Sequence, residues 1–170
     1  MKKSQKGFTI IEVALVLAIG ALIFLVVFLA VPALQRNQRN DARKRDISSV
    51  VEAVAVYTSN NPKQILKGGY AYQGGTANKT GDNTGLAKYL DTLSTNTEEV
   101  IVGRVDQYIN SIENDRFFGS DNNRPSRIYV VTGAKCDGST KLATGSSRSV
   151  AVIGGVETSK GHQAYCQDAE

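Results

Sequence analysis

The sequence KGFTIIEV, residues 6–13, opens a long apolar stretch. From Val13 to Leu34 the chain has no charged residue. As an α-helix, these residues are about 33 Å long, enough to cross a bilayer hydrocarbon core of roughly 30 Å. From residue 35 onward the chain is polar and rich in Gly, Asn, Ser and Thr. The apolar stretch is incompatible with a purely cytosolic protein.

Charge does not point to a nucleic-acid partner. The 170 residues, enough for one compact domain with an appendage, carry a formal net charge of +4. Lys2, Lys3 and Lys6 supply three of these charges, and all three precede the apolar stretch. Two cysteines, Cys136 and Cys166, are too few for a tetrahedral metal site. Beyond a membrane segment the environment is oxidising, which favours a single disulfide.

A basic tip followed by an apolar stretch has two ordinary explanations, a cleaved secretory signal and a plain membrane anchor. The stretch is longer than the roughly 7–15 apolar residues of a secretory signal, and no small-x-small cleavage site follows Pro32. A plain anchor fits the length but does not explain Glu12. An ionised carboxylate in hydrocarbon costs about 2.5–3.5 kcal/mol, although near a membrane face it reaches water.

The same residues resemble the class III signal sequence of type IV prepilins and of the pseudopilins of type II secretion. The basic leader, Gly7, Phe8, Glu12 and the apolar helix carry this resemblance, which extends to roughly residue 59. It implies that a prepilin peptidase cuts between Gly7 and Phe8, that Phe8 is then N-methylated, and that the apolar helix stays on the mature protein. It also identifies Glu12 with the glutamate of the family.

Physical reasoning supports these roles. Cleavage after Gly7 exposes an α-amine beside the apolar helix, and in a staggered bundle this amine reaches the Glu12 carboxylate of a neighbouring subunit. A paired charge is tolerated in low dielectric, whereas a lone one is heavily penalised. We therefore expect Glu12 to set the assembly register. Gly7 resists helix formation and leaves the scissile bond accessible.

Apolar spacing predicts one helix over residues 8–59, ending at Asn60-Asn61-Pro62. Its second half carries a single apolar stripe that is expected to pack on a carboxy-terminal head: Ile47, Val50, Val51, Val54 and Ala55. Pro32 is expected to kink or locally melt the helix, and Gly20 to add a second soft point.

The head is expected to contain loops, short helices and strands. Strands are predicted at 70–72, 127–132, 149–153 and 163–166, and helices at 86–93 and 100–112, with a strand at 100–102 as the alternative for the start of the second helix. The fold class is α+β, a long helix packed on a small antiparallel sheet, the lollipop-like pilin fold. The expected parts are 1–7 as a cleaved leader, 8–34 as a transmembrane or filament-core helix, 35–59 as its amphipathic continuation, 60–126 as a variable loop with short helices, and 127–170 as strands with a disulfide-bounded region.

A basic cluster follows the apolar stretch: Arg36, Arg39, Arg43, Lys44 and Arg45, relieved by Asp41 and Asp46. The simplest interpretation is a solvated helix face. The alternative is contact with anionic lipid headgroups or with acidic neighbours in a filament. Because both flanks of the span are basic, the processing motif is what places the amino terminus in the cytoplasm.

Other signals are weaker. His162, the sole histidine, lies in a predicted turn, and no catalytic or zinc motif accompanies it. Ordinary turn chemistry is favoured over calcium binding at Asp82/Asn83 and at Asp121/Asn122/Asn123. The triplet 78–80 matches a glycosylation acceptor. Four tyrosines are candidates for DNA stacking, with core packing as the default: Tyr57, Tyr70, Tyr72 and Tyr89.

The expected function is that of a structural, non-enzymatic pilin without a cofactor. It would occupy the cytoplasmic membrane as a single-pass protein and then an extracellular filament serving adhesion, motility or DNA uptake. Expected partners are other pilin subunits, the prepilin peptidase, the membrane assembly machinery and a surface receptor or DNA. The alternatives are a type II secretion pseudopilin and a membrane-anchored binding or enzymatic domain.

Overall fold

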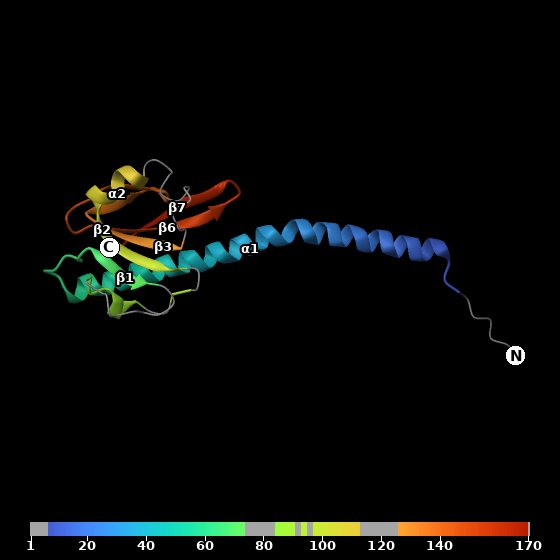
Figure 1. Ribbon diagram of the computed structural model, residues 1–170, viewed down its shortest axis with the longest axis horizontal. Helices are drawn as coiled ribbons and strands as arrows, with labels where there is room; N and C mark the ends of the chain where they lie inside the picture. The colour runs from blue at the N-terminus through green and yellow to red at the C-terminus, as the bar shows by residue number, and fades with distance from the viewer. Residues whose placement is uncertain (1–6, 74–83, 91–92, 95–96, 113–125, 170) are drawn as a thin grey trace. The chain divides into compact units, whose positions relative to one another are not determined.

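The computed structural model describes residues 7–73, 84–90, 93–94, 97–112 and 126–169 (Figure 1). In chain order the elements are α1 (Ile10–Asn60), β1 (Gly69–Gln73), the 3-10 helix η2 (Ala87–Tyr89), β2 (Glu99–Arg104), α2 (Val105–Ile112), β3 (Arg127–Thr132), β4 (Ala134–Asp137), β5 (Lys141–Thr144), β6 (Val150–Thr158) and β7 (Gly161–Asp168). The chain divides into two compact units, Met1–Asn37 and Gln38–Glu170. A long helix followed by a sheet confirms the predicted α+β class.

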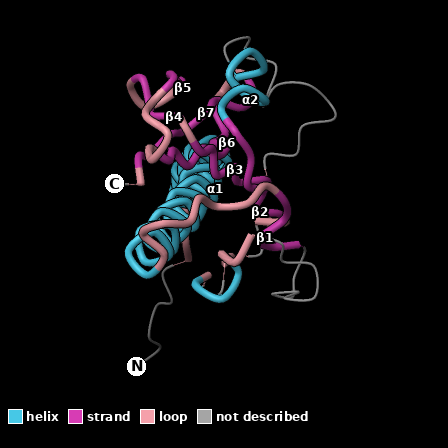
Figure 2. Tube along the Cα trace, turned by 90° about the vertical axis from the view of Figure 1, so that its left-hand side faces the viewer, coloured by secondary structure: helices cyan, strands magenta, loops and turns pink. Residues whose placement is uncertain are grey.

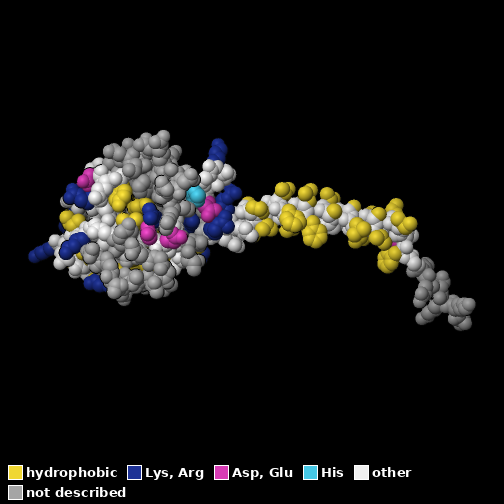
Figure 3. Space-filling model, viewed as in Figure 1, with side chains coloured by type: hydrophobic (Ala, Val, Ile, Leu, Met, Phe, Trp, Pro, Cys, Tyr) yellow, Lys and Arg dark blue, Asp and Glu magenta, His cyan; other side chains and the backbone are white. Residues whose placement is uncertain are grey.

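The first unit is helical from Ile10 onward. Its helix is long and apolar enough to cross a membrane by length and composition, with a mean hydropathy of 3.2 in its most apolar window, none of which is buried. In Figure 3, hydrophobic side chains cover the visible surface of this apolar helix. Helical structure continues through Gly20 and Pro32 without a break, and a kink or local melting near Pro32 stays a prediction.

The second unit packs the carboxy-terminal part of α1 against one face of a five-stranded sheet, ordered β1-β2-β3-β6-β7 (Figure 2). Ile47, Val50 and Val54 of the predicted stripe are fully buried there, and Val51 packs against them in part. The apolar stripe was therefore predicted correctly except at Ala55, which is only partly buried, while Ala53 joins the core instead. α1 ends at Asn60, directly before Asn61 and Pro62.

The opposite face of the sheet is covered by α2 and the β4–β5 hairpin. Strand β3 shows how one short segment serves both sides. Ile128 and Val130 join the core next to α1, whereas Tyr129 and Val131 join the second core, because successive strand side chains point to opposite faces. Burial on both sides explains why β3 is almost continuously apolar.

The antiparallel sheet predicted from the strands at 127–132, 149–153 and 163–166 is confirmed for β3, β6 and β7, and the whole sheet is mixed. β2 and β3 are parallel, with Glu99 opposite Arg127, while the other neighbouring strands are antiparallel. Parallel neighbours require a crossover connection, and α2 lies within the one that joins β2 to β3. The predicted helix over 100–112 therefore begins only at Val105, and the alternative strand at 100–102 is the correct one.

Two further strand predictions and one helix prediction need correction. β4 and β5 were not predicted, since each is only four residues long. β6 continues through Gly154 and Gly155 to Thr158, beyond the predicted strand over 149–153. A Cβ on Gly154 would stand 2.7 Å from Cδ1 of Ile47, so this glycine allows α1 to lie close to the sheet. η2 has three residues, within a predicted helix of eight.

Candidate functional site

The segment before α1 contains the predicted cleavage site. Gly7 and Phe8 precede the first helical residue, Ile10, and both are exposed. The side chain of Phe8 is 88% exposed, and a Cβ on Gly7 would meet nothing within 4 Å. The bond between these two residues therefore lies in open, non-helical backbone, the geometry that a protease requires.

Thr9 and Glu12 form a capping box at the start of α1. Thr9 donates hydrogen bonds from its backbone N–H and its Oγ1 to Oε2 of Glu12, at 2.9 and 2.8 Å. In return the backbone N–H of Glu12 donates to Oγ1 of Thr9 at 3.4 Å. Such reciprocal bonds satisfy amide donors that the first helical turn leaves without partners.

Sequence reasoning missed this local role of Glu12, although the spacing Thr-x-x-Glu before an apolar run is its known signal. The carboxylate therefore has one role that the structure shows and a second role that is predicted. Its hydrogen bonds to Thr9 define where the helix starts within one chain, whereas the predicted pairing with an α-amine acts between chains. An experiment on assembly must distinguish them.

The solvated helix face that was expected is present only in part: Lys44 and Arg45 are exposed, whereas Arg39 and Arg43 bind strand β6. Arg39 donates from Nε and Nη2 to the carboxylate of Glu157 in β6, at 2.8–3.2 Å. Asn40 pairs with the backbone of Glu157 twice: its Nδ2 donates to the carbonyl oxygen at 2.8 Å, and its Oδ1 accepts from the N–H at 2.7 Å. Arg43 is buried, and its Nη1 donates to the carbonyl oxygen of Gly155 at 2.9 Å.

Asp46 is also buried, against expectation. Its Oδ1 accepts from the backbone N–H of Ser94 at 3.0 Å, and its Oδ2 accepts from the hydroxyls of Ser94 and Thr97, each at 2.5 Å. This carboxylate ties the segment before β2 to α1. A sequence pattern cannot show that a charged helix residue is satisfied by a loop about fifty residues away.

Electrostatics at Glu157 give the head a sensitivity to acid. Hydrogen bonds from Arg39 hold the pKa of Glu157 below its usual range. Because its unfolded pKa, about 4.3, is higher, the ionised form stabilises the folded state. This contribution is present above about pH 4.3 and is lost as the pH falls through the lowered folded-state pKa.

We expect Glu157→Gln to lower the melting temperature by a few degrees at neutral pH, because the neutral amide loses the charge that Arg39 and Arg43 face. The fall in melting temperature on acidification should also be smaller in this variant. Calorimetry of the full chain in detergent micelles at several pH values measures both. Glu52→Gln, an exposed position on α1, is the matched control. Parallel pH curves for wild type and Glu157→Gln would contradict the prediction.

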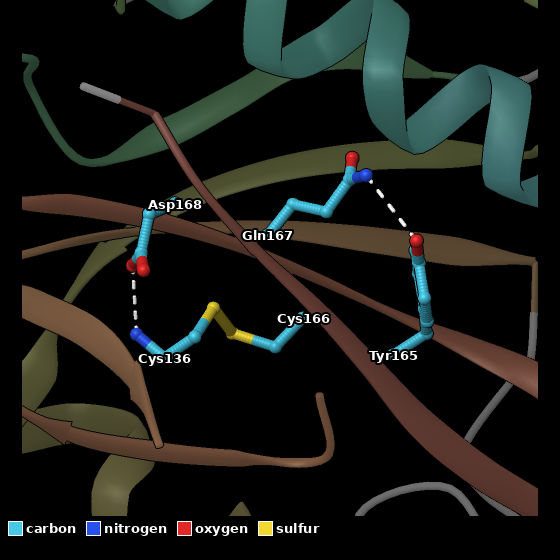
Figure 4. Close-up of a disulfide and its surroundings, with 5 residues drawn as sticks. All are labelled: Cys136, Tyr165, Cys166, Gln167 and Asp168. Carbon is cyan, nitrogen blue, oxygen red and sulfur yellow. Dashed lines mark hydrogen bonds between the residues drawn. A yellow bond between two sulfur atoms is a disulfide. The ribbon is translucent and has the colours of Figure 1, made fainter. Parts of the chain in front are cut away.

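Cys136 and Cys166 are joined in a disulfide, with their Cα atoms 5.8 Å apart (Figure 4). The bond connects β4 of the hairpin to β7 of the main sheet. Asp168, on the same side of β7 as Cys166, accepts a hydrogen bond from the N–H of Cys136 at 2.7 Å. Closing a loop of 30 residues stabilises a fold by roughly 3–4 kcal/mol in the chain-entropy description.

The weaker sequence signals fall in several places. His162 lies in β7 opposite Glu157, so its placement in a turn was wrong. Tyr57 and Tyr72 are buried in the core next to α1, where they cannot stack on bases. No group of three metal-ligating side chains occurs among the residues that the structure describes. The calcium candidates at 82–83 and 121–123 and the glycosylation triplet at 78–80 lie outside those residues.

Comparison with known proteins identifies the amino-terminal segment. Residues 2–28 match the family model of the prokaryotic N-terminal methylation motif. This motif contains the class III signal that is characteristic of type IV pilins and pseudopilins. The match covers the leader, the Gly7–Phe8 bond, the capping box and most of the apolar helix. No curated protein and no solved structure matches the chain. The methylation motif supports a type IV pilin-like or pseudopilin-like protein.

Proposed function

We propose that this protein is the structural subunit of a type IV pilus-like filament, assembled through its amino-terminal helix. The methylation motif at residues 2–28 is the observation that carries the proposal. The exposed apolar helix supports it, because contact between this apolar surface and water is unfavourable. Lipid or other helices are therefore expected to cover the surface. The head has its own two-sided core, to which α1 contributes only residues that follow Gln38.

The proposed pathway starts in the cytoplasmic membrane, with the amino terminus inside and the helix over 8–34 spanning the bilayer. The peptidase removes residues 1–7 and Phe8 is methylated. The helix then moves from lipid into a bundle of like helices, where apolar burial of roughly 25 cal/mol per Å² holds the subunits together. Such a heterologous, non-closing contact produces a filament, with the head on its surface.

Within this pathway each site residue has a proposed role. Gly7 and Phe8 flank the processed bond, and Glu12 sets the register by pairing with the amine of a neighbour. Gly20 and Pro32 are points at which the helix can pack closely or unwind. The disulfide keeps the head folded outside the cell. Adhesion, motility and DNA uptake are the tasks proposed for the filament.

The mass of the mature amino terminus tests the proposal. We expect the purified protein to begin at Phe8 and to carry one added methyl group, since one measurement reports both processing steps. Gly7→Leu should retain residues 1–7, because its branched side chain obstructs the backbone before the scissile bond. Gly20→Leu, within the helix, is the control and should be processed normally. A mature wild-type chain that still begins at residue 1 would favour a plain membrane-anchored domain.

The choice between pilus and pseudopilus requires a second measurement. Surface filaments seen by electron microscopy and lost on deletion of the gene would support the pilus. A deletion that blocks protein secretion and removes no surface filament would instead support a pseudopilin.

A further inference from the structure

Strand β6 lies along α1 and runs in the opposite direction. Gly154 faces Ile47, Gly155 binds Arg43, and Glu157 binds Asn40. Three residues of strand advance about 10 Å, and seven residues of helix also advance about 10 Å, so the two elements remain in step. The β6–β7 turn over residues 158–161 therefore continues past Asn40, toward Gln38, where the chain enters the head.

We name this part of the head the entry edge, defined as residues 38–45 of α1 and 157–162 of the β6–β7 hairpin. It carries five basic side chains and two acidic ones: Arg39, Arg43, Lys44, Arg45 and Lys160 against Asp41 and Glu157. Lys and Arg side chains gather there in the view of Figure 3.

The acidic charge of Glu157 is already engaged by arginines of α1. Arg39 binds it directly, and Nη2 of Arg43 lies 3.9 Å from it. The side chain of Arg39 nevertheless remains 45% exposed, and Lys160 is exposed at the turn. The turn itself is held by Thr158, whose Oγ1 donates to the carbonyl oxygen of Gly161 at 3.1 Å and accepts from the N–H of Lys160 at 3.3 Å. The entry edge thus presents a net positive surface on an ordered hairpin.

The covalent chain places this surface close to lipid. Only four residue steps separate Leu34, the last residue of the apolar stretch, from Gln38. Even fully extended they span about 14 Å at most. This limit holds for any orientation of the two units. With Leu34 at the surface of an anionic bilayer, Gln38 stays within one to two Debye lengths of it, so basic side chains beside Gln38 are attracted to that surface.

We propose that the entry edge docks on anionic phospholipid headgroups while the protein is anchored in the membrane. Lys160 and Arg39 face the headgroup phosphates, and the hairpin turn is the part of the sheet that touches them. This inference rests on the proposed membrane anchor and is independent of polymerisation. An acidic surface on another copy of the chain is the competing occupant.

The test uses the full chain in nanodiscs, one chain per disc, of either phosphatidylcholine or phosphatidylglycerol. Amide hydrogen exchange of residues 158–162 is the measurement. We expect slower exchange in phosphatidylglycerol discs than in phosphatidylcholine discs, with the difference removed by high salt. Lys160→Gln should reduce this ratio about fivefold, since one basic residue near an anionic surface contributes about a factor of that size.

Lys63→Gln is the matched control, because Lys63 follows the far end of α1. At a rise of about 1.5 Å per residue, that end of the helix lies roughly 33 Å from Gln38. This variant should leave the ratio unchanged. Equal exchange in the two lipids would overturn the proposal, as would an equal effect of both variants. Protection that appears only when many chains share one membrane would assign the surface to another copy instead. All of these outcomes are independent of whether filaments form.

Discussion

Glu12→Ala is expected to leave membrane insertion intact and to reduce filament yield by at least about tenfold, since a factor of ten needs only about 1.4 kcal/mol. Insertion depends on the apolar stretch from Val13 to Leu34, which the substitution does not touch. In the proposed filament, assembly depends on the charge pair between subunits, because the substitution leaves the freed α-amine without a counter-charge in low dielectric. Membrane fractionation measures insertion, and electron microscopy with quantification of sheared filaments measures assembly.

Two further variants separate the pairing of Glu12 from its capping role. Glu12→Gln keeps an oxygen that accepts hydrogen bonds from Thr9, as glutamine does in other capping boxes, but it removes the charge. Thr9→Ala removes the partner within the chain and keeps the charge. If pairing sets the register, Glu12→Gln fails to assemble and Thr9→Ala assembles. The reverse result would mean that the start of the helix, and not the charge, is what assembly requires.

Asp46→Ala is expected to destabilise the head by about 3 kcal/mol, or roughly 10 °C in melting temperature. The substitution removes a carboxylate that accepts three hydrogen bonds. The hydroxyl of Thr97 and the N–H and hydroxyl of Ser94 then lose this acceptor in a largely buried site. Calorimetry of the full chain in detergent micelles measures the shift. Hydrogen exchange should show the largest loss of protection in residues 97–99.

Asp41→Ala is the control for this prediction. Asp41 is exposed and lies on the same helix five residues earlier. A surface substitution of this kind changes stability by about 0.5 kcal/mol or less. If Asp46→Ala melts within a degree of wild type, the loop does not depend on the buried carboxylate, and the energetic argument for this contact is wrong.

The parts of the fold that could be predicted from sequence are those in which a single periodic pattern decides the structure. α1 is one such part: uniform apolar composition is followed by a stripe at helical spacing, and Asn61 and Pro62 mark the end. β3 is another, and its bounds, Arg127–Thr132, agree with the prediction. In both elements local propensity and burial favour the same structure.

The remaining features depend on contacts distant in sequence. The parallel pairing of β2 with β3 follows from a crossover that local patterns do not reveal. Gly154 and Gly155 are of the residue type that marks turns, but they lie in strand β6, where Gly154 leaves room for Ile47. Arg43 and Asp46 resemble surface charges, yet Gly155 and the segment before β2 bury them. At the amino terminus the resemblance identified the processing motif, whereas the capping role of Thr9 was missed.

The disulfide-linked hairpin protects an edge strand of the head against aggregation. β7 is an outermost strand of the sheet, the kind of strand that can recruit a strand from another molecule and nucleate aggregates. The backbone N–H of Cys166 is already used by the carbonyl oxygen of Ser139, in the turn between β4 and β5, at 2.8 Å. Cross-linking holds that turn in place and obstructs strand recruitment at Cys166. In the proposed filament, cohesion between copies would thereby be left to their apolar helices, and the heads would stay close at high local concentration as separate folded bodies.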